Sequence, residues 1–164
     1  KIFSIDFILT KIENAENIAW IDADTVCLKP FFYNDLLPFF PKQSSNEIMS
    51  YLGRTHYPKD NPYSECGFLG FNLKSPFTQK YLNRMKDLYM SGEAFRYTEW
   101  HDSWLWDQTR NEFEQKGFQF RDISGQFSNL EHPFVNSGLG EFFDHLKGDR
   151  RKAFGKSLIH DFVK

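Results

Sequence analysis

The chain has 164 residues, of which 40% are hydrophobic, 26% charged and 18% aromatic, values that suit one folded domain with a substantial core. The formal net charge of −2 argues against a general nucleic-acid-binding protein. Because no apolar run approaches the roughly 18 residues of a membrane span and no secretory signal opens the sequence, we expect no membrane span and a cytoplasmic location.

Two apolar patterns open the chain. The first covers residues 3–12 and predicts a helix that packs on a sheet with Phe3, Phe7 and Ile8 facing inward. The second, at residues 18–21, is short and apolar on both faces, which is typical of a buried strand. We therefore expect this second segment to be the central strand of the domain.

Two carboxylates follow this strand directly. Residue alternation along an extended chain would point Asp22 and Asp24 to the same side, where like charges repel each other and are costly to bury. A hard divalent cation removes that cost, and oxygen ligands suit Mg²⁺ or Mn²⁺. The alternative is that both aspartates only stabilise a turn or cap the next helix. The residue pattern alone leaves both interpretations open.

Apolar periodicity and turn residues predict the elements beyond the aspartates. Pro76 favours the first turn of a helix, with Ser75 as its cap. The expected elements are a short helix over 33–39, strands over 47–52, 67–72 and 118–123, helices over 76–90 and 102–116, and a helical turn over 141–146.

The strand over 67–72 belongs to a polar and glycine-containing segment that begins at Glu65. Gly67 allows close approach of a ligand or of another strand. Glu65 and Asn72 bracket the apolar run, and polar groups in such a position need partners. The alternative is a core strand that contains glycine and has exposed ends.

A third candidate segment contains Trp100, His101 and Asp102 at the start of the second long helix. A carboxylate at a helix start is stabilised by the free backbone N–H groups, so Asp102 suits an N-cap. Asp102 also suits a group that holds a sugar hydroxyl, with Trp100 as an apolar wall. The two roles are compatible.

The fourth candidate is His145, which precedes a basic segment. A neutral imidazole is a good third ligand for a cation already held by carboxylates. Lys147, Arg151 and Lys152 would neutralise a diphosphate, although an isolated run of charges is usually a solvated turn. Other histidines compete for the ligand role: His56, His101, His132 and His160.

Residues 20–25, with the sequence WIDADT, resemble the Asp-x-Asp segment of glycosyltransferases with the nucleotide-diphospho-sugar transferase fold, also called the glycosyltransferase-A fold. Three later segments agree in order. Residues 65–72 resemble the strand that lines the sugar site, and residues 99–107 resemble the acidic segment that opens the following helix. Residues 145–152 are similar to the His-x-x-Gly-x-x-Lys element of family-eight-like transferases, but Arg151 stands at the usual lysine and no Pro-Trp follows.

This resemblance, which covers residues 1–156, implies an α/β fold with a mixed, mostly parallel sheet flanked by helices, in a single catalytic domain over residues 1–164. It implies Mn²⁺ or Mg²⁺ as cofactor, a UDP- or GDP-sugar as donor and a glycan or other hydroxyl compound as acceptor. The expected metal ligands are Asp22, Asp24 and His145.

The resemblance also assigns roles to the other candidate residues. Glu65 and Asp102 are the expected catalytic residues, which hold donor or acceptor hydroxyls; one of them would act as the general base if the reaction inverts the sugar stereochemistry. The expected substrate-binding residues are Trp100, His101, Gly67, Asn72, Lys147, Arg151 and Lys152.

In that family the strands that bind the nucleotide precede the Asp-x-Asp segment, and only residues 1–21 precede it here. We therefore expect a piece of a longer transferase that lacks its upstream nucleotide-binding strands. Such a piece would bind the donor poorly, and localisation signals would be missing with the upstream segment.

Two other functions remain open. The aspartates also fit the first motif of haloacid-dehalogenase-like phosphatases, in which Asp22 would be the nucleophile, Asp24 the acid or base and Mg²⁺ the cofactor. The sequence lacks a convincing later acidic pair for that metal site. The other alternative is a non-catalytic glycan-binding domain, in which aromatic side chains hold sugar rings.

Overall fold

The computed structural model describes residues 1–43, 46–54, 63–125 and 132–147. The α-helices in this part of the chain are α1 (Ile2–Leu9), α2 (Tyr33–Leu36), α3 (Pro76–Met90), α4 (Asp102–Glu114) and α5 (Pro133–Asn136). The 3₁₀ turns are η1 (Leu37–Phe39), η2 (Glu93–Arg96) and η3 (Gly138–Glu141). The strands are β1 (Asn17–Ile21), β2 (Thr25–Cys27), β3 (Glu47–Leu52), β4 (Glu65–Asn72), β5 (Gln119–Asp122) and β6 (Phe143–His145).

The described strands form a mixed sheet in the order β1-β4-β3-β5 and a separate β2–β6 pair. The fold is therefore mixed α/β, with a sheet flanked by helices, as expected. The prediction of a mostly parallel sheet is wrong for these strands, because β4 runs antiparallel to both β1 and β3 and only β3 and β5 are parallel. An apolar run identifies a strand, but it does not fix the direction of the neighbouring strand.

The inner strands of this sheet are β4 and β3, whereas β1 lies at its edge. All eight residues of β4 are buried, and those of β1 are half-buried. The prediction of a central strand over residues 18–21 is therefore wrong for the described sheet. Apolar residues on both faces of a strand do not show whether it has a neighbouring strand on each side.

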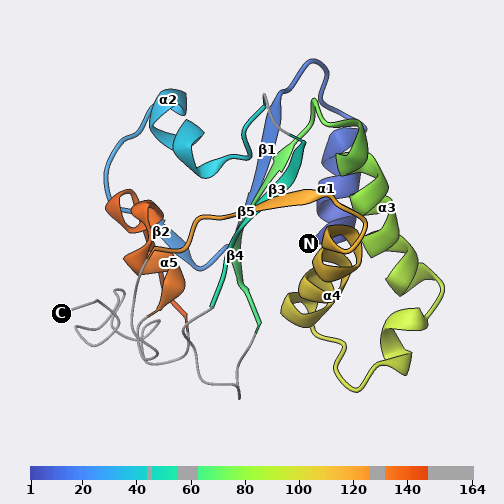
Figure 1. Ribbon diagram of the computed structural model, residues 1–164. Coiled ribbons are helices and arrows are strands. Elements are labelled where there is room, and N and C mark those ends of the chain that lie inside the picture. Colours follow the sequence, from blue (N-terminus) through green and yellow to red (C-terminus); the bar gives the residue numbers. More distant parts are fainter. Residues whose placement is uncertain (44–45, 55–62, 126–131, 148–164) are drawn as a thin grey trace.

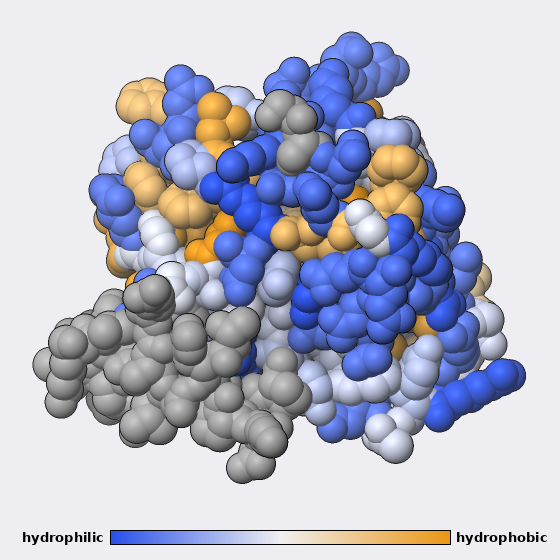
Figure 2. Space-filling view, viewed as in Figure 1, coloured by the Kyte–Doolittle hydropathy of each residue, from blue (hydrophilic) through white to orange (hydrophobic). Residues whose placement is uncertain are grey.

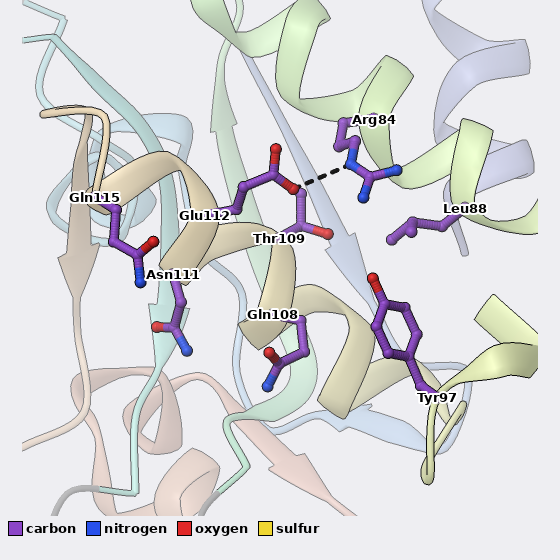
Figure 3. Close-up of a pocket in the computed structure, with 8 residues that line it drawn as sticks. All are labelled: Arg84, Leu88, Tyr97, Gln108, Thr109, Asn111, Glu112 and Gln115. Carbon is purple, nitrogen blue, oxygen red and sulfur yellow. Dashed lines mark hydrogen bonds and ion pairs between the residues drawn. The ribbon is translucent and has the colours of Figure 1, made fainter. Parts of the chain in front are cut away.

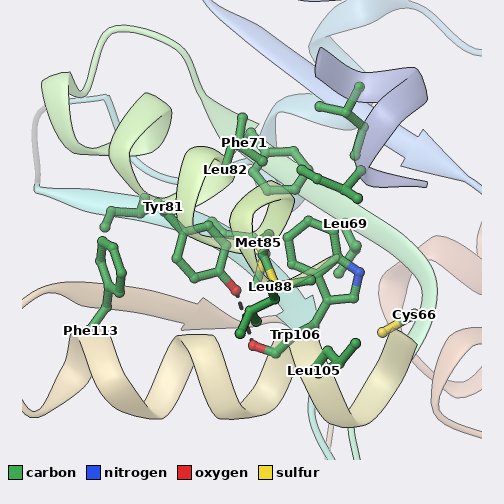
Figure 4. Close-up of a cluster of buried hydrophobic side chains, with 14 of the residues drawn as sticks. Cys66, Leu69, Phe71, Tyr81, Leu82, Met85, Leu88, Leu105, Trp106 and Phe113 are labelled. Carbon is green, nitrogen blue, oxygen red and sulfur yellow. Dashed lines mark hydrogen bonds between the residues drawn. The ribbon is translucent and has the colours of Figure 1, made fainter. Parts of the chain in front are cut away.

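Two apolar clusters lie on opposite faces of the sheet. Figure 1 shows α1, α3 and α4 along one face, and α2, α5 and the β2–β6 pair on the other side. The larger cluster joins α1, α3 and α4 to the sheet through fully buried side chains such as Phe71, Tyr81 and Trp106 (Figure 4). The smaller cluster includes Phe68 and Phe134. Burial of each such side chain stabilises the fold by about 1.5–3 kcal/mol.

The two long helices have clear local causes. Pro76 occupies the first turn of α3, and the Ser75 hydroxyl accepts a hydrogen bond from the Phe77 N–H, as predicted. The start of α4 is close to the expected position, but its cap is the His101 ring, which accepts from the Trp104 N–H at 3.3 Å. Asp102 is therefore the first residue of α4 and not its N-cap, although its carboxylate does accept a hydrogen bond at the helix start, from the Ser103 N–H at 2.8 Å.

The inward face of α1 differs from the prediction. Ile2 and Ile5 are buried, whereas Phe3, Phe7 and Ile8 are exposed. Most residues of α1 are apolar, so two faces of the helix satisfy the helical spacing and tertiary packing decides between them. No helix in the described ranges is both long and apolar enough to cross a membrane.

Candidate metal centre

The turn between β1 and β2 places the two aspartates of the Asp-x-Asp segment. The Asp22 N–H donates to the Gly67 carbonyl at 3.0 Å and so extends the β1–β4 ladder by one bond. The Thr25 N–H then donates to the Asp22 carbonyl at 3.1 Å and closes a tight turn. Asp22 and Asp24 therefore lie in a turn beyond the end of β1. The prediction that alternation along a strand brings them to the same side is wrong.

The short β2–β6 pair brings His145 to this turn. Thr25 pairs with His145, and the Leu146 N–H donates to the Asp24 carbonyl at 2.9 Å. The strand β6 replaces the helical turn predicted over 141–146, which was wrong. Its pairing explains why a histidine that lies 121 residues after Asp24 is its neighbour in space.

Asp22, Asp24 and His145 form a compact group of possible ligands, whose ligand atoms all lie within 4.8 Å of one another. His145 Nε2 is 3.1 Å from Asp24 Oδ1 and 3.9 Å from Asp22 Oδ2. The imidazole is buried, with 1% of the residue exposed, while both carboxylates are partly open to solvent. A cation could therefore approach from the side of the carboxylates.

Lys1 links this group to Asp102. Its ammonium group is 3.1 Å from Asp22 Oδ1 and 2.8 Å from Asp102 Oδ2, and it donates to the Cys66 carbonyl at 2.9 Å. Burial alone would raise the pKa of Asp102, but the hydrogen bond and charge of Lys1 outweigh it and lower that pKa. Asp102 is thus an ionised, partly exposed carboxylate beside the candidate centre, where the sequence placed a hydroxyl-binding group.

Glu65 lies on the other side of His145 and is almost completely buried, with 1% exposed. Its carboxylate is 2.6 Å from Arg54 Nη2 and 2.5 Å from Lys147 Nζ, and His132 Nε2 lies at 3.6 Å. Burial would raise the pKa of Glu65, but the charges of Lys147, His132 and Arg54 outweigh it and hold the pKa well below its usual range. A carboxylate in these ion pairs is a weak proton acceptor.

Glu65, His132 and His145 form a second group with the geometry of a metal site. Two positive side chains, those of Arg54 and Lys147, already contact Glu65. A cation at this second group would be repelled by them or would have to displace them. In the group of Asp22, Asp24 and His145, by contrast, the two carboxylates are partly exposed and one lysine, Lys1, contacts Asp22. These three residues are also the expected metal ligands. We therefore regard Asp22, Asp24 and His145 as the stronger candidate.

The remaining predicted residues divide into near and distant ones. Gly67 and Lys147 border the group, through contact with His145 and with Glu65 respectively. Asn72 does not: it lies at the opposite end of β4, paired with Asn17. Its side chain bonds the Glu47 carbonyl and the Lys74 N–H.

Trp100 and His101 lie in the segment that precedes α4. Trp100 is 59% exposed and stacks on Phe95 at 5.9 Å between ring centroids. His101 caps α4 and contacts Glu99 at 2.8 Å. Arg151 and Lys152 lie outside the described residues, as do His56 and His160.

A separate pocket of about 190 Å³ lies between α3 and α4 (Figure 3). Its Arg84 guanidinium bridges Glu93 at 2.8 Å and Glu112 at 3.0 Å. None of the candidate metal ligands lines this pocket. No observation points to a ligand for this pocket, so we assign none to it.

Sequence reasoning missed two residues of the centre. Lys1 pairs with Asp22 and Arg54 pairs with Glu65. A single lysine or arginine has no sequence motif that would identify it as such a partner. His132 was only one of several competing histidines. The signal for Asp22 and Asp24 was their spacing after an apolar strand, whereas His145 was chosen among the competing histidines by the family resemblance.

The comparisons with known proteins leave the family open. No protein-family model matches the chain, and neither the curated proteins nor the solved structures gave a significant match. Any function must therefore be argued from the residues and their geometry.

Proposed function

We propose that the chain is part of a metal-dependent sugar transferase with a glycosyltransferase-A-like, Rossmann-like fold. The observation that carries this proposal is the convergence of Asp22, Asp24 and His145 from two distant segments of the sequence, with ligand atoms within 4.8 Å of one another. Two carboxylates and one imidazole suit Mn²⁺, and the oxygen ligands also suit Mg²⁺. The group therefore fits the cation that the Asp-x-Asp resemblance implies.

In this proposal Asp22, Asp24 and His145 would hold the cation beside the binding site for the diphosphate of a nucleotide-diphospho-sugar. Once bound, the cation acts as a Lewis acid that stabilises negative charge on the departing diphosphate. Lys147 contributes a further positive charge next to the site, where such charge favours the same group. Arg151 and Lys152 keep their proposed role in diphosphate binding.

The two predicted catalytic carboxylates have different environments. Asp102 is partly exposed, with 41% of its side chain accessible, and it is held beside Asp22 through their shared lysine. It can accept a hydrogen bond from a sugar hydroxyl, and it is the better placed of the two to receive a proton from an acceptor. Glu65 is buried in ion pairs, so we assign it to the support of the centre rather than to proton transfer.

The test is a set of three assays on the wild-type chain and on Asp22→Ala/Asp24→Ala. A transferase should release UDP or GDP from nucleotide-sugars in the presence of Mn²⁺, and the double variant should lose this release. Hydrolysis of p-nitrophenyl phosphate that depends on Asp22 would instead identify a phosphatase. Glycan binding that is unchanged in the double variant, without any metal dependence, would identify the binding domain.

A further inference from the structure

The imidazole of His145 lies directly against the backbone of β4 at Gly67. A Cβ atom at Gly67 would be 2.6 Å from His145 Cε1 and 2.7 Å from Nδ1, well inside the 3.4 Å at which ordinary contacts begin. The φ angle of Gly67 is not in the left-handed region that favours glycine; among the described glycines only Gly92 and Gly117 have positive φ. The space taken by the imidazole, and not the backbone conformation, therefore requires glycine here.

The imidazole has little room to retreat from an added side chain. Its ring packs against Phe134, with centroids 5.1 Å apart, and against His132 at 5.2 Å. The Phe134 ring itself would be 3.2 Å from the added Cβ. Pairing with Thr25 in the β2–β6 ladder fixes the His145 backbone, so a methyl group at Gly67 would have to tilt or displace the ring.

Glu65 lies on the Nδ1 side of the His145 ring. Its Oε1 atom lies 3.9 Å from His145 Nδ1 and accepts a hydrogen bond from the Gly67 N–H at 3.1 Å. Its Oε2 atom is held by Arg54 and Lys147, so the whole carboxylate is fixed. A negative oxygen on this side favours a hydrogen on Nδ1, which leaves Nε2 available to a cation on the side of the aspartates.

We infer that Gly67 is a positioning residue: it leaves the space in which the His145 imidazole lies with Nε2 turned toward Asp22 and Asp24. The inference rests on the proposed function, because the orientation of the ring matters only if His145 is a metal ligand. It assigns to Gly67 a role separate from contact with a substrate. The neighbouring Glu65 supports the same orientation from the Nδ1 side.

The experiment compares Gly67→Ala with a matched control, Gly70→Ala. Both glycines lie in β4, and a Cβ at Gly70 would be 2.4 Å from Ser50 Oγ, so the site at Gly70 is also crowded. Both variants should therefore lose thermal stability. Titration with Mn²⁺ should show an affinity about 10- to 100-fold weaker in Gly67→Ala, the range typical of residues that orient a metal ligand, and a change below about twofold in Gly70→Ala.

A double-mutant cycle with His145→Ala provides a readout that needs no metal. Removal of the imidazole creates the space that the alanine methyl needs, so Gly67→Ala should lower the Tm less in the His145→Ala background than in the wild type. If Gly67→Ala alone fails to fold, the double variant should still fold better than that single variant. A double variant as unstable as the sum of its parts would overturn the contact.

The outcomes distinguish this inference from the proposed function. Equal Mn²⁺ affinity in Gly67→Ala and in the wild type, or an equal loss in Gly70→Ala, overturns the positioning role alone. A wild-type chain that does not bind Mn²⁺ overturns the metal centre and the positioning role together. Heteronuclear NMR of the His145 ring in Gly67→Ala should show a changed chemical environment without metal, and an unchanged ring signal contradicts the inference.

Discussion

The two sides of the sheet stabilise the molecule in different ways. Against α1, α3 and α4 the sheet packs apolar and aromatic side chains, of which Tyr81 and Trp106 are the largest (Figure 4). Around β6 and the end of β4, Glu65 and His145 are buried just as fully. Buried charge is costly unless it is paired, so the second region depends on its ion pairs as well as on the smaller apolar cluster. One region gives stability, and the other retains groups that can do chemistry.

The surface shows a related contrast. In Figure 2 the visible face over α4 is mainly hydrophilic, whereas apolar side chains gather on the side that carries α2. Phe32, with 81% exposed, is the most exposed of the large hydrophobic residues in the described part of the chain. Its neighbours Phe31, Tyr33 and Leu37 are exposed as well, so the apolar surface on this side is a group of residues around α2.

The largest expected effect is on the apolar side. Trp106→Ala removes a side chain that is 1% exposed and packs on Phe71 and Tyr81. The expected loss is about 3–5 kcal/mol in the free energy of unfolding, measured by urea denaturation, and it should vary little with pH. The matched control is Trp100→Ala at an exposed site, where a change within about 0.5 kcal/mol is expected. Equal effects of the two substitutions would contradict the assignment of the core.

On the charged side the expected effect depends on pH. The pKa of Glu65 is lowered below its ordinary value of 4.5 by Lys147, His132 and Arg54 despite burial. A lowered pKa in the folded state contributes stability that is present above about 4.5 and is lost as the pH falls toward the folded-state pKa. Glu65→Gln should therefore lower the Tm at pH 7 and weaken the dependence of Tm on pH below 4.5.

The measurement for Glu65 is thermal unfolding from pH 7 down to pH 3, followed by circular dichroism. The free energy lost at pH 7 should be about 1–3 kcal/mol, because the amide removes the negative charge that pairs with Arg54 and Lys147. A variant whose acid-induced loss of stability has the same slope as that of the wild type would show that Glu65 is not held ionised.

The smallest expected effect lies in the pocket between α3 and α4. Glu112→Gln breaks the ion pairs of Glu112 with Arg84 and with Lys116, in which all the side chains are partly exposed. Pairs of this kind contribute about 0.2–1 kcal/mol, and Glu93 remains to hold the arginine. Urea denaturation in low and high salt measures the effect, which should shrink as salt rises. A loss as large as that of Trp106→Ala would show that this surface network is essential to the fold.

Much of the secondary structure could be predicted from the sequence. The strand over 47–52 and the helix over 76–90 have the predicted bounds, because their apolar spacing and caps are local properties. The inward face of α1 and the strand β6 could not be predicted in the same way. Each depends on a partner that is distant in the sequence, and a nearly uniform apolar helix or a three-residue strand carries little signal of its own.

The candidate centre was predictable in part. The spacing of Asp22 and Asp24 suggested two nearby carboxylates, although a turn and not a strand brings them together. The choice of His145 came from the family resemblance, and the β2–β6 pairing gives it a physical reason. The ion pairs of Lys1 and Arg54 join distant parts of the chain, and no local sequence pattern predicts them.

The most direct test of the metal centre is Mn²⁺ titration calorimetry with and without UDP or inorganic pyrophosphate, on the wild type and on Asp22→Asn/Asp24→Asn. Asp87→Asn, an exposed aspartate on α3, is the matched control for loss of negative charge. We predict that the wild type and the control bind Mn²⁺, that either diphosphate tightens this binding, and that the double variant loses it. Equal Mn²⁺ affinity in the double variant and in the control would contradict the metal centre and, with it, the proposed transferase.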